Sequence, residues 1–225
     1  MKKLMFYLVL LVCLVVMPVG VQAYTINDPA NDSIGYPEFE TFGINISNIY
    51  QAPVTIDLFT NYGPAGLLVN TWNTMPADLF ITETYNGSQY LWAIPTATHG
   101  AFNAGTMYAV GTYKVSDNFD PSGGAGYIYN HNVPVQIATT GNNYGYESLA
   151  GGSISYSQDA ATGIWDYSIV EQIYQDDPNG KFSLLWGTAT CANDVVSSPV
   201  PEPATMLLFG LGLIGLAGVR RKFKK

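Results

Sequence analysis

The chain has 225 residues, of which 48% are hydrophobic and 12% charged, and its formal net charge is −8. Between residues 24 and 198 there are two basic residues, Lys114 and Lys181, against sixteen acidic ones, which gives this body a net charge of −14. Such a body repels phosphate backbones and anionic lipids, so nucleic-acid binding is excluded, whereas neutral polymers and cations stay open as partners.

The N-terminal segment, residues 1–23, has the organisation of a removable signal peptide. Lys2 and Lys3 give it a positive start, a long apolar run follows, and small residues precede a polar segment. We expect the Sec translocon to export the chain and signal peptidase to cut between Ala23 and Tyr24. A permanent membrane helix is the alternative.

Residues 24–194 alternate between apolar and polar side chains, which is the period of a β-strand. Val54, Ile56 and Leu58, for example, interleave with polar neighbours. Turn sequences separate several such runs. The runs predict strands at residues 79–85, 89–94, 106–113, 126–129, 133–138, 152–157, 164–173 and 182–190. The sequence therefore predicts one all-β domain, an antiparallel β-sandwich or jelly roll, flanked by the N-terminal signal helix and a C-terminal transmembrane helix.

Cys191 is the single cysteine in the predicted mature body, so an intramolecular disulfide is excluded. His99 or His131 could in principle activate Cys191 as a nucleophile, because such partners lie far apart in sequence. A buried structural cysteine and two surface histidines are the favoured interpretation.

Glycoside hydrolysis needs two carboxylates at the right separation, and Glu83, Glu147 and Glu171 are candidates in principle. None of them lies in a run of acidic residues that alternate on one strand face. We therefore expect no catalytic residues, and the chain is predicted not to be an enzyme.

Two acidic loops could bind calcium, which takes oxygen ligands from Asp, Asn and backbone carbonyls. Asp117 and Asp120 lie in one loop, and Asp176 and Asp177 lie in the other. Both loops are equally well explained as turns that Asp and Asn side chains close without an ion. No cofactor is therefore expected, and calcium stays open as an alternative.

Tyr144 and Tyr146 lie in a polar, Gly-rich loop. Exposed tyrosines can stack on sugar rings and offer hydroxyl groups, so these two residues suggest a lectin-like ligand-binding surface. Tyrosine is also an ordinary strand residue, which leaves a purely structural role open.

The C-terminal part of the chain combines three features. Residues 204–219 contain no charge and form an expected membrane helix, short against the ~20 residues usual for a span. Residues 220–225 are a basic tail whose expected cytoplasmic anchor is Arg220, Arg221 and Lys222. Residues 195–203 are expected to be a linker that contains a Val-Pro-Glu-Pro sequence, Val200, Pro201, Glu202 and Pro203.

This order of a Pro-Glu-Pro motif, an apolar helix rich in Gly and Leu, and a terminal basic cluster resembles the PEP-CTERM sorting signal. The resemblance implies recognition by an exosortase, a membrane-embedded cysteine protease that cleaves near the Pro-Glu-Pro. It also implies a Gram-negative host that makes exopolysaccharide, and export to the cell surface or exterior with only transient membrane anchoring. A tail anchor that is never cleaved is the alternative.

Short segments of the body are similar to mature domains of PEP-CTERM proteins. They are residues 32–35, 60–62, 76–79 and 186–195. This resemblance implies a concanavalin-like β-sandwich, and it carries no activity, because a fold alone does not define a function.

These features predict an exported cell-surface or extracellular-matrix protein with a non-catalytic structural or interaction role linked to exopolysaccharide or biofilm. A carbohydrate-binding, lectin-like module, with or without calcium, is the main alternative. A glycan hydrolase is the less favoured one.

Overall fold

The computed structural model describes residues 23–48, 53–69, 72–85, 87–116, 130–138, 148–149, 152–171 and 181–200. The predicted signal helix, membrane helix, basic tail and strand at 126–129 lie outside these described residues. Within them the chain forms fifteen strands and one short 3-10 helix, η1 (Pro37–Phe39). No helix in the described part of the chain is long and apolar enough to cross a membrane.

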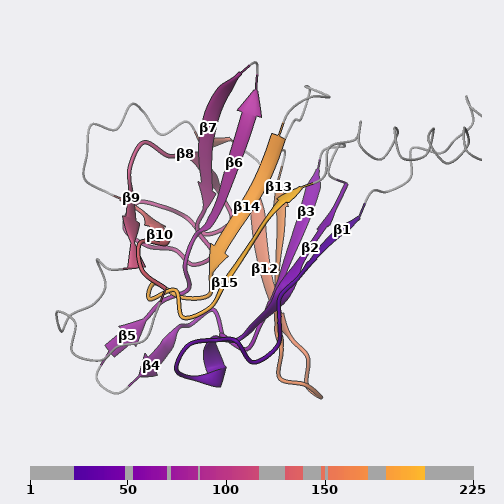
Figure 1. The fold of residues 1–225 in the computed structure, drawn as a ribbon, viewed down its shortest axis with the longest axis vertical. Helices are drawn as coiled ribbons and strands as arrows, with labels where there is room; N and C mark the ends of the chain where they lie inside the picture. The colour runs from indigo at the N-terminus through magenta and orange to yellow at the C-terminus, as the bar shows by residue number, and fades with distance from the viewer. Residues whose placement is uncertain are drawn as a thin grey trace, which may run out of the picture.

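Most strands belong to two antiparallel sheets (Figure 1). The five-stranded sheet has, in spatial order, β1 (Tyr24–Asn27), β2 (Thr41–Ser47), β3 (Val54–Thr60), β13 (Trp165–Glu171) and β12 (Ser153–Gln158). The six-stranded sheet has β11 (Ser148–Leu149), β8 (Met107–Ala109), β7 (Ser88–Ile94), β6 (Leu79–Tyr85), β14 (Lys181–Gly187) and β15 (Val195–Val200). Two ribbons complete the fold, β4 (Leu67–Val69) with β5 (Trp72–Thr74), and β9 (Tyr113–Val115) with β10 (Pro134–Ile137).

The two large sheets pack face to face through one apolar core. Burial alternates along β3, where Val54, Ile56 and Leu58 are buried and the residues between them are partly exposed. Ile81 of β6 and Trp186 of β14 meet them from the six-stranded sheet. The predicted all-β antiparallel architecture is therefore confirmed, whereas the jelly-roll connectivity and the concanavalin-like type stay predictions.

The six-stranded sheet is apolar on its second face as well. Phe80, Ala93 and Tyr108 pack there with Phe102, which lies in the loop after β7, and with Ile137 of β10. Figure 1 shows the β9–β10 ribbon beside β6, β7 and β8. This sheet is therefore covered on both faces, which explains why β6 carries consecutive apolar residues.

Several predicted boundaries are wrong, and the strand expected at 182–190, for example, ends at Gly187. The run at 106–113 was expected as one strand, but the chain leaves the sheet after β8 and enters a separate ribbon at β9. The segment from Val195 was expected to be a linker, but Val195–Val200 forms β15 and pairs with β14. Val196 is buried in the main core, and Pro199 is tolerated because β15 is an edge strand.

Candidate functional site

The loop after β1 and the loop before β15 are joined by a set of contacts that we call the terminal clasp, residues 28–41 and 188–195. The Ile34 N–H donates to the Asn193 carbonyl oxygen (2.7 Å), and the Asn193 side-chain amide donates to the Ile34 carbonyl oxygen (2.6 Å). β15 also lies in contact with β1 and β2, so the first and last described strands are neighbours across the sandwich.

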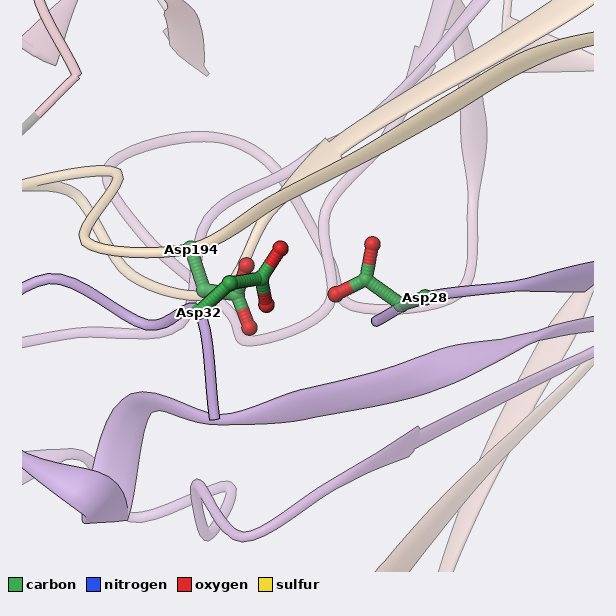
Figure 2. Close-up of side chains that lie close together, drawn as sticks. All are labelled: Asp28, Asp32 and Asp194. Carbon is green, nitrogen blue, oxygen red and sulfur yellow. The ribbon is translucent and has the colours of Figure 1, made fainter. Parts of the chain in front are cut away.

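Three carboxylates converge in the terminal clasp. One oxygen each from Asp28, Asp32 and Asp194 lies within 4.8 Å of the others. Figure 2 shows Asp32 beside Asp194, with Asp28 directed toward them from the opposite side. Asp194 is almost fully buried, and its two oxygens accept the N–H groups of Thr41 (2.6 Å) and Val195 (2.8 Å). Asp32 is exposed, so the cluster opens to solvent on its side.

Glu40 closes the loop that carries Asp28 and Asp32. Its carboxylate accepts the N–H of Asn31 and, at 3.4 Å, that of Ser33. The next residue, Thr41, shares a 2.6 Å hydroxyl–hydroxyl hydrogen bond with Thr188, which lies in the loop between β14 and β15. The loop is therefore held against the C-terminal strand by both backbone and side-chain bonds.

The crowding of carboxylates raises two pKa values. Burial and then the charge of Asp194 raise the pKa of Asp28 to about 8, with further upward contributions from Asp32 and Glu40. Burial raises the pKa of Asp194 to about 6, although its backbone donor from Thr41 acts in the opposite direction. The cluster therefore retains a proton near neutral pH.

Asp28, Asp32 and Asp194 are also the described residues that could hold a metal ion. Their oxygen ligands suit a hard divalent cation such as Ca²⁺. A proton shared among the three carboxylates relieves their mutual charge repulsion as a bound cation would. Because acidic side chains also commonly gather without an ion, the geometry alone assigns no metal.

His99 is bound to a buried acid. Its Nε2 lies 2.9 Å and 3.0 Å from the two carboxylate oxygens of Asp78, which also accepts the Ile137 N–H at 2.7 Å. The expected surface position of His99 is therefore wrong, because its side chain is only 14% exposed. Burial raises the pKa of Asp78, and His99 acts in the opposite direction. The pair fixes the loop after β7 and strand β10 to the start of β6.

Cys191 carries a partly buried thiol. Burial raises its pKa to about 11, so the thiol stays protonated at neutral pH and is a poor nucleophile. His99 bonds to Asp78 in the structure, and His131 is exposed. Of the carboxylates considered for hydrolysis, Glu83 lies in β6 and Glu171 in β13, which belong to different sheets.

Few of the site residues predicted from sequence can be located. Tyr24 is the first residue of β1 and pairs with Ile46, and the neighbouring Ala23 is exposed. Val200 is the last residue of β15. The others lie outside the described residues: Asp117, Asp120, Tyr144, Tyr146, Asp176, Asp177, Pro201, Glu202, Pro203, Arg220, Arg221 and Lys222, together with Glu147.

The clustering of Asp28 with Asp32 and Asp194 was missed from the sequence. Asp32 and Asp194 each lie in a segment noted for its resemblance to other mature domains, but nothing in either segment indicated that the two meet. The signal that could have found the cluster is that Asp28 directly follows the first strand of the domain and Asp194 directly precedes the last described strand.

The comparisons with known proteins bear on the end of the chain. A family model for the PEP-CTERM protein-sorting motif matches residues 199–222. The chain carries a PEP-CTERM sorting signal. This PEP-CTERM motif implies export, sorting to the cell surface and processing by an exosortase. No similar curated protein and no similar solved structure was found.

The PEP-CTERM motif overlaps the folded domain. It begins at residue 199, whereas β15 ends at Val200. Residues 199 and 200 therefore belong both to the sorting motif and to the edge of the six-stranded sheet. The sorting motif begins inside the sheet, without an intervening linker.

Proposed function

We propose that the exported domain has a non-catalytic structural and interaction role in the cell surface or the exopolysaccharide matrix. The observation that carries this proposal is that His99 and Cys191, an acid–base and a nucleophile candidate that the structure describes, are held within the fold. A general acid or base has to reach the substrate, directly or through one water. His99 bonds the fully buried Asp78 through Nε2, and its side chain is only 14% exposed, so little of the ring can reach a substrate.

Cys191 supports the same proposal. Its raised pKa removes the thiolate that nucleophilic catalysis needs at neutral pH. Asp194 is likewise engaged on both oxygens by backbone N–H groups. The proposal includes no resident cofactor, and its partners are the Sec translocon and the exosortase during export and the surface matrix afterwards.

Sugar release tests the non-catalytic role. The full chain, purified in detergent, is incubated with exopolysaccharide from the producing cells, and new reducing ends are measured against heat-denatured protein. We expect no difference between the two samples. Release by the native protein alone would contradict the proposal, and loss of that release in Asp78→Asn or Cys191→Ser would name the group responsible.

A carbohydrate-binding role is the alternative left open by the sequence. It is compatible with a non-catalytic domain. The observation that favours it is that the five-stranded sheet exposes polar side chains, such as Thr25, Asn45 and Asp57, on the face away from the core. Tyr144 and Tyr146, the residues first suggested for such a role, lie outside the described residues.

A further inference from the structure

The outer face of the five-stranded sheet carries one polar side chain from every strand in a single row. The register places Thr25 opposite Asn45, Asn45 opposite Asp57, Asp57 opposite Ser168, and Ser168 opposite Ser155. We call these five residues the polar row. Neighbouring strands lie ~4.8 Å apart, so the row extends for about 19 Å across the sheet.

The polar row points away from the apolar core. The residues next to it along β2 and β3, such as Ile44 and Ile56, are fully buried. The row residues themselves are all partly or fully exposed. The opposite sheet differs, because its outer face is covered by Phe102 and Ile137. Among the described residues, the polar row therefore lies on a sheet face that is open to a partner.

The rows on either side consist almost entirely of short side chains. One contains Gly43, Phe59, Asp166 and Ser157, and the other contains Ser47, Thr55, Val170 and Ser153. The five strands contain no Lys, Arg or His. With few long side chains on this face, a chain molecule can approach the hydrogen-bonding groups closely.

The face retains hydrogen-bonding capacity. Asp57 Oδ1 accepts the Ser168 hydroxyl at 2.7 Å, and its other oxygen is open to a further donor. Asp166, two residues from Ser168 along β13, is partly exposed and adds a second carboxylate to the face. Phe59 lies directly opposite Asp166 and is partly exposed, so an apolar ring borders these acceptors.

The composition of the face selects the class of partner. Asp57 and Asp166, with no cation on the five strands, repel phosphate, sulfate and carboxylate polymers. A protein partner would need a core of apolar and aromatic area, for which the face offers only Phe59 and Val170. A neutral sugar polymer offers the complementary chemistry, hydroxyl groups at regular intervals and C–H surfaces.

We propose that the outer face of the five-stranded sheet binds a neutral polysaccharide chain along the polar row. Asn45, Asp57 and Ser155 bond sugar hydroxyl groups, and Phe59 packs against the C–H face of a sugar ring. This inference rests on the proposed interaction role in the surface matrix and names the surface and the partner class for it.

Affinity electrophoresis of the full chain in detergent tests this assignment. Gels contain a neutral polymer (dextran, a mixed-linkage β-glucan or a galactomannan) or the anionic polymer alginate. We expect retardation by at least one neutral polymer and none by alginate. Asn45→Ala and Ser155→Trp should weaken the retardation at least tenfold, the first by removing an amide and the second by obstructing the row. Gln89→Trp, on an exposed position of β7, is the matched control and should bind like the native chain.

The other outcomes would each contradict the glycan assignment, the location of the binding site or the proposed function. Absence of retardation by all three neutral polymers, or stronger retardation by alginate, would overturn the glycan assignment and leave the non-catalytic role standing. Retardation that survives in Asn45→Ala and Ser155→Trp would place binding elsewhere and overturn this face as the site. Sugar release in the separate hydrolysis assay would overturn the proposed function itself. Unchanged unfolding midpoints of the variants establish that weaker retardation is not a folding defect.

Discussion

Asp28 lies partly buried beside two other carboxylates, and each charged group that acts on it raises its pKa. Asp194 has two backbone donors that stabilise its charge, and Asp32 has solvent. Asp28 is thus the member of the cluster on which a proton is held. The stability of the terminal clasp is therefore expected to depend on pH. The His99–Asp78 pair is a second polar contact that we expect to contribute to the free energy of unfolding.

Asp28→Asn should stabilise the domain at neutral and alkaline pH. The folded-state pKa of about 8 exceeds the ordinary 3.8, so between these values the folded state binds more protons than the unfolded state. The stability that the protonated carboxyl contributes is present below about pH 4 and is lost as the pH rises toward 8. Asparagine keeps the neutral amide, and after allowance for solvent screening we expect a gain of about 1–2 kcal/mol at pH 8.

Urea unfolding from pH 5 to 8 in EDTA, which removes any cation that could replace the proton, measures this effect. Asp32, Glu40 and Asp194 face Asp28 and stay unchanged in the variant. Asp159→Asn is the control, because Asp159 is exposed and backbone donors lower its pKa, so the variant should show no such gain. Parallel pH dependence in Asp28→Asn and the native chain would refute the assignment.

Removing the acid of the His99–Asp78 pair should lower the free energy of unfolding more than removing the base does. Asp78→Ala leaves both the Ile137 N–H and His99 without an acceptor, at about 3 kcal/mol. His99→Ala leaves the buried Asp78 carboxyl with the Ile137 donor alone, at about 2 kcal/mol. Chemical unfolding of both single variants and the double variant gives the coupling energy. His131→Ala, at an exposed position, is the control and should change stability by less than about 0.5 kcal/mol. Equal effects of Asp78→Ala and His131→Ala would show that the pair is not structural.

At the scale of elements, β15 combines two roles. It pairs with β14 along six residues and contributes Val196 to the core, and its last two residues already belong to the PEP-CTERM motif. β15 is an edge strand, bonded to the sheet on one side only, and the chain continues from it into the rest of the sorting motif.

Val196→Ala should therefore destabilise the domain as a core substitution does. Val196 is 2% exposed, and removing two buried methyl groups should cost about 1–2 kcal/mol. Ser197→Ala, at the next position and exposed, should change stability by less than about 0.5 kcal/mol. Urea unfolding of both variants decides between a strand and a linker, because a linker would leave the two variants equally stable.

At the scale of the whole molecule, the domain has its first and last strands in contact and one of its two sheets open on the outer face. The terminal clasp bonds the loop after β1 to the loop before β15, so the two ends of the described domain are joined. Folding and sorting are consequently separable at Val200, where the sheet stops and the greater part of the sorting motif remains.

Two truncations test this separation. A chain that ends at Val200 should fold with an unchanged unfolding midpoint but fail to reach the cell surface, because most of the motif at 199–222 is lost. A chain that ends at Asp194 should also lose stability, because β15 and its buried Val196 are removed. Surface fractionation and thermal unfolding measure the two properties. Normal surface delivery of the chain that ends at Val200 would contradict the sorting role of the motif.

Alternation along the chain determined much of the fold in advance. Val54, Ile56 and Leu58 alternate with polar residues because β3 has a core on one side and the open face on the other, and this period is visible in any single strand. β15 was missed because Val195 and Val196 are followed by Ser-Ser-Pro, in which no alternation can be seen. This segment forms a strand because it pairs with β14, and that pairing cannot be read from the sequence of the segment.

The sequence by itself determined the PEP-CTERM sorting signal of this protein, because that signal is a contiguous segment and its recognition from sequence needs no fold. It also determined the acidity of the body and its all-β class, which are properties of composition and period. Only the tertiary structure decided that Asp28 and Asp32 meet Asp194, that His99 meets Asp78, and that five strands align one polar row. Each depends on which distant strands and loops become neighbours, and that choice is made by the packing of the two sheets.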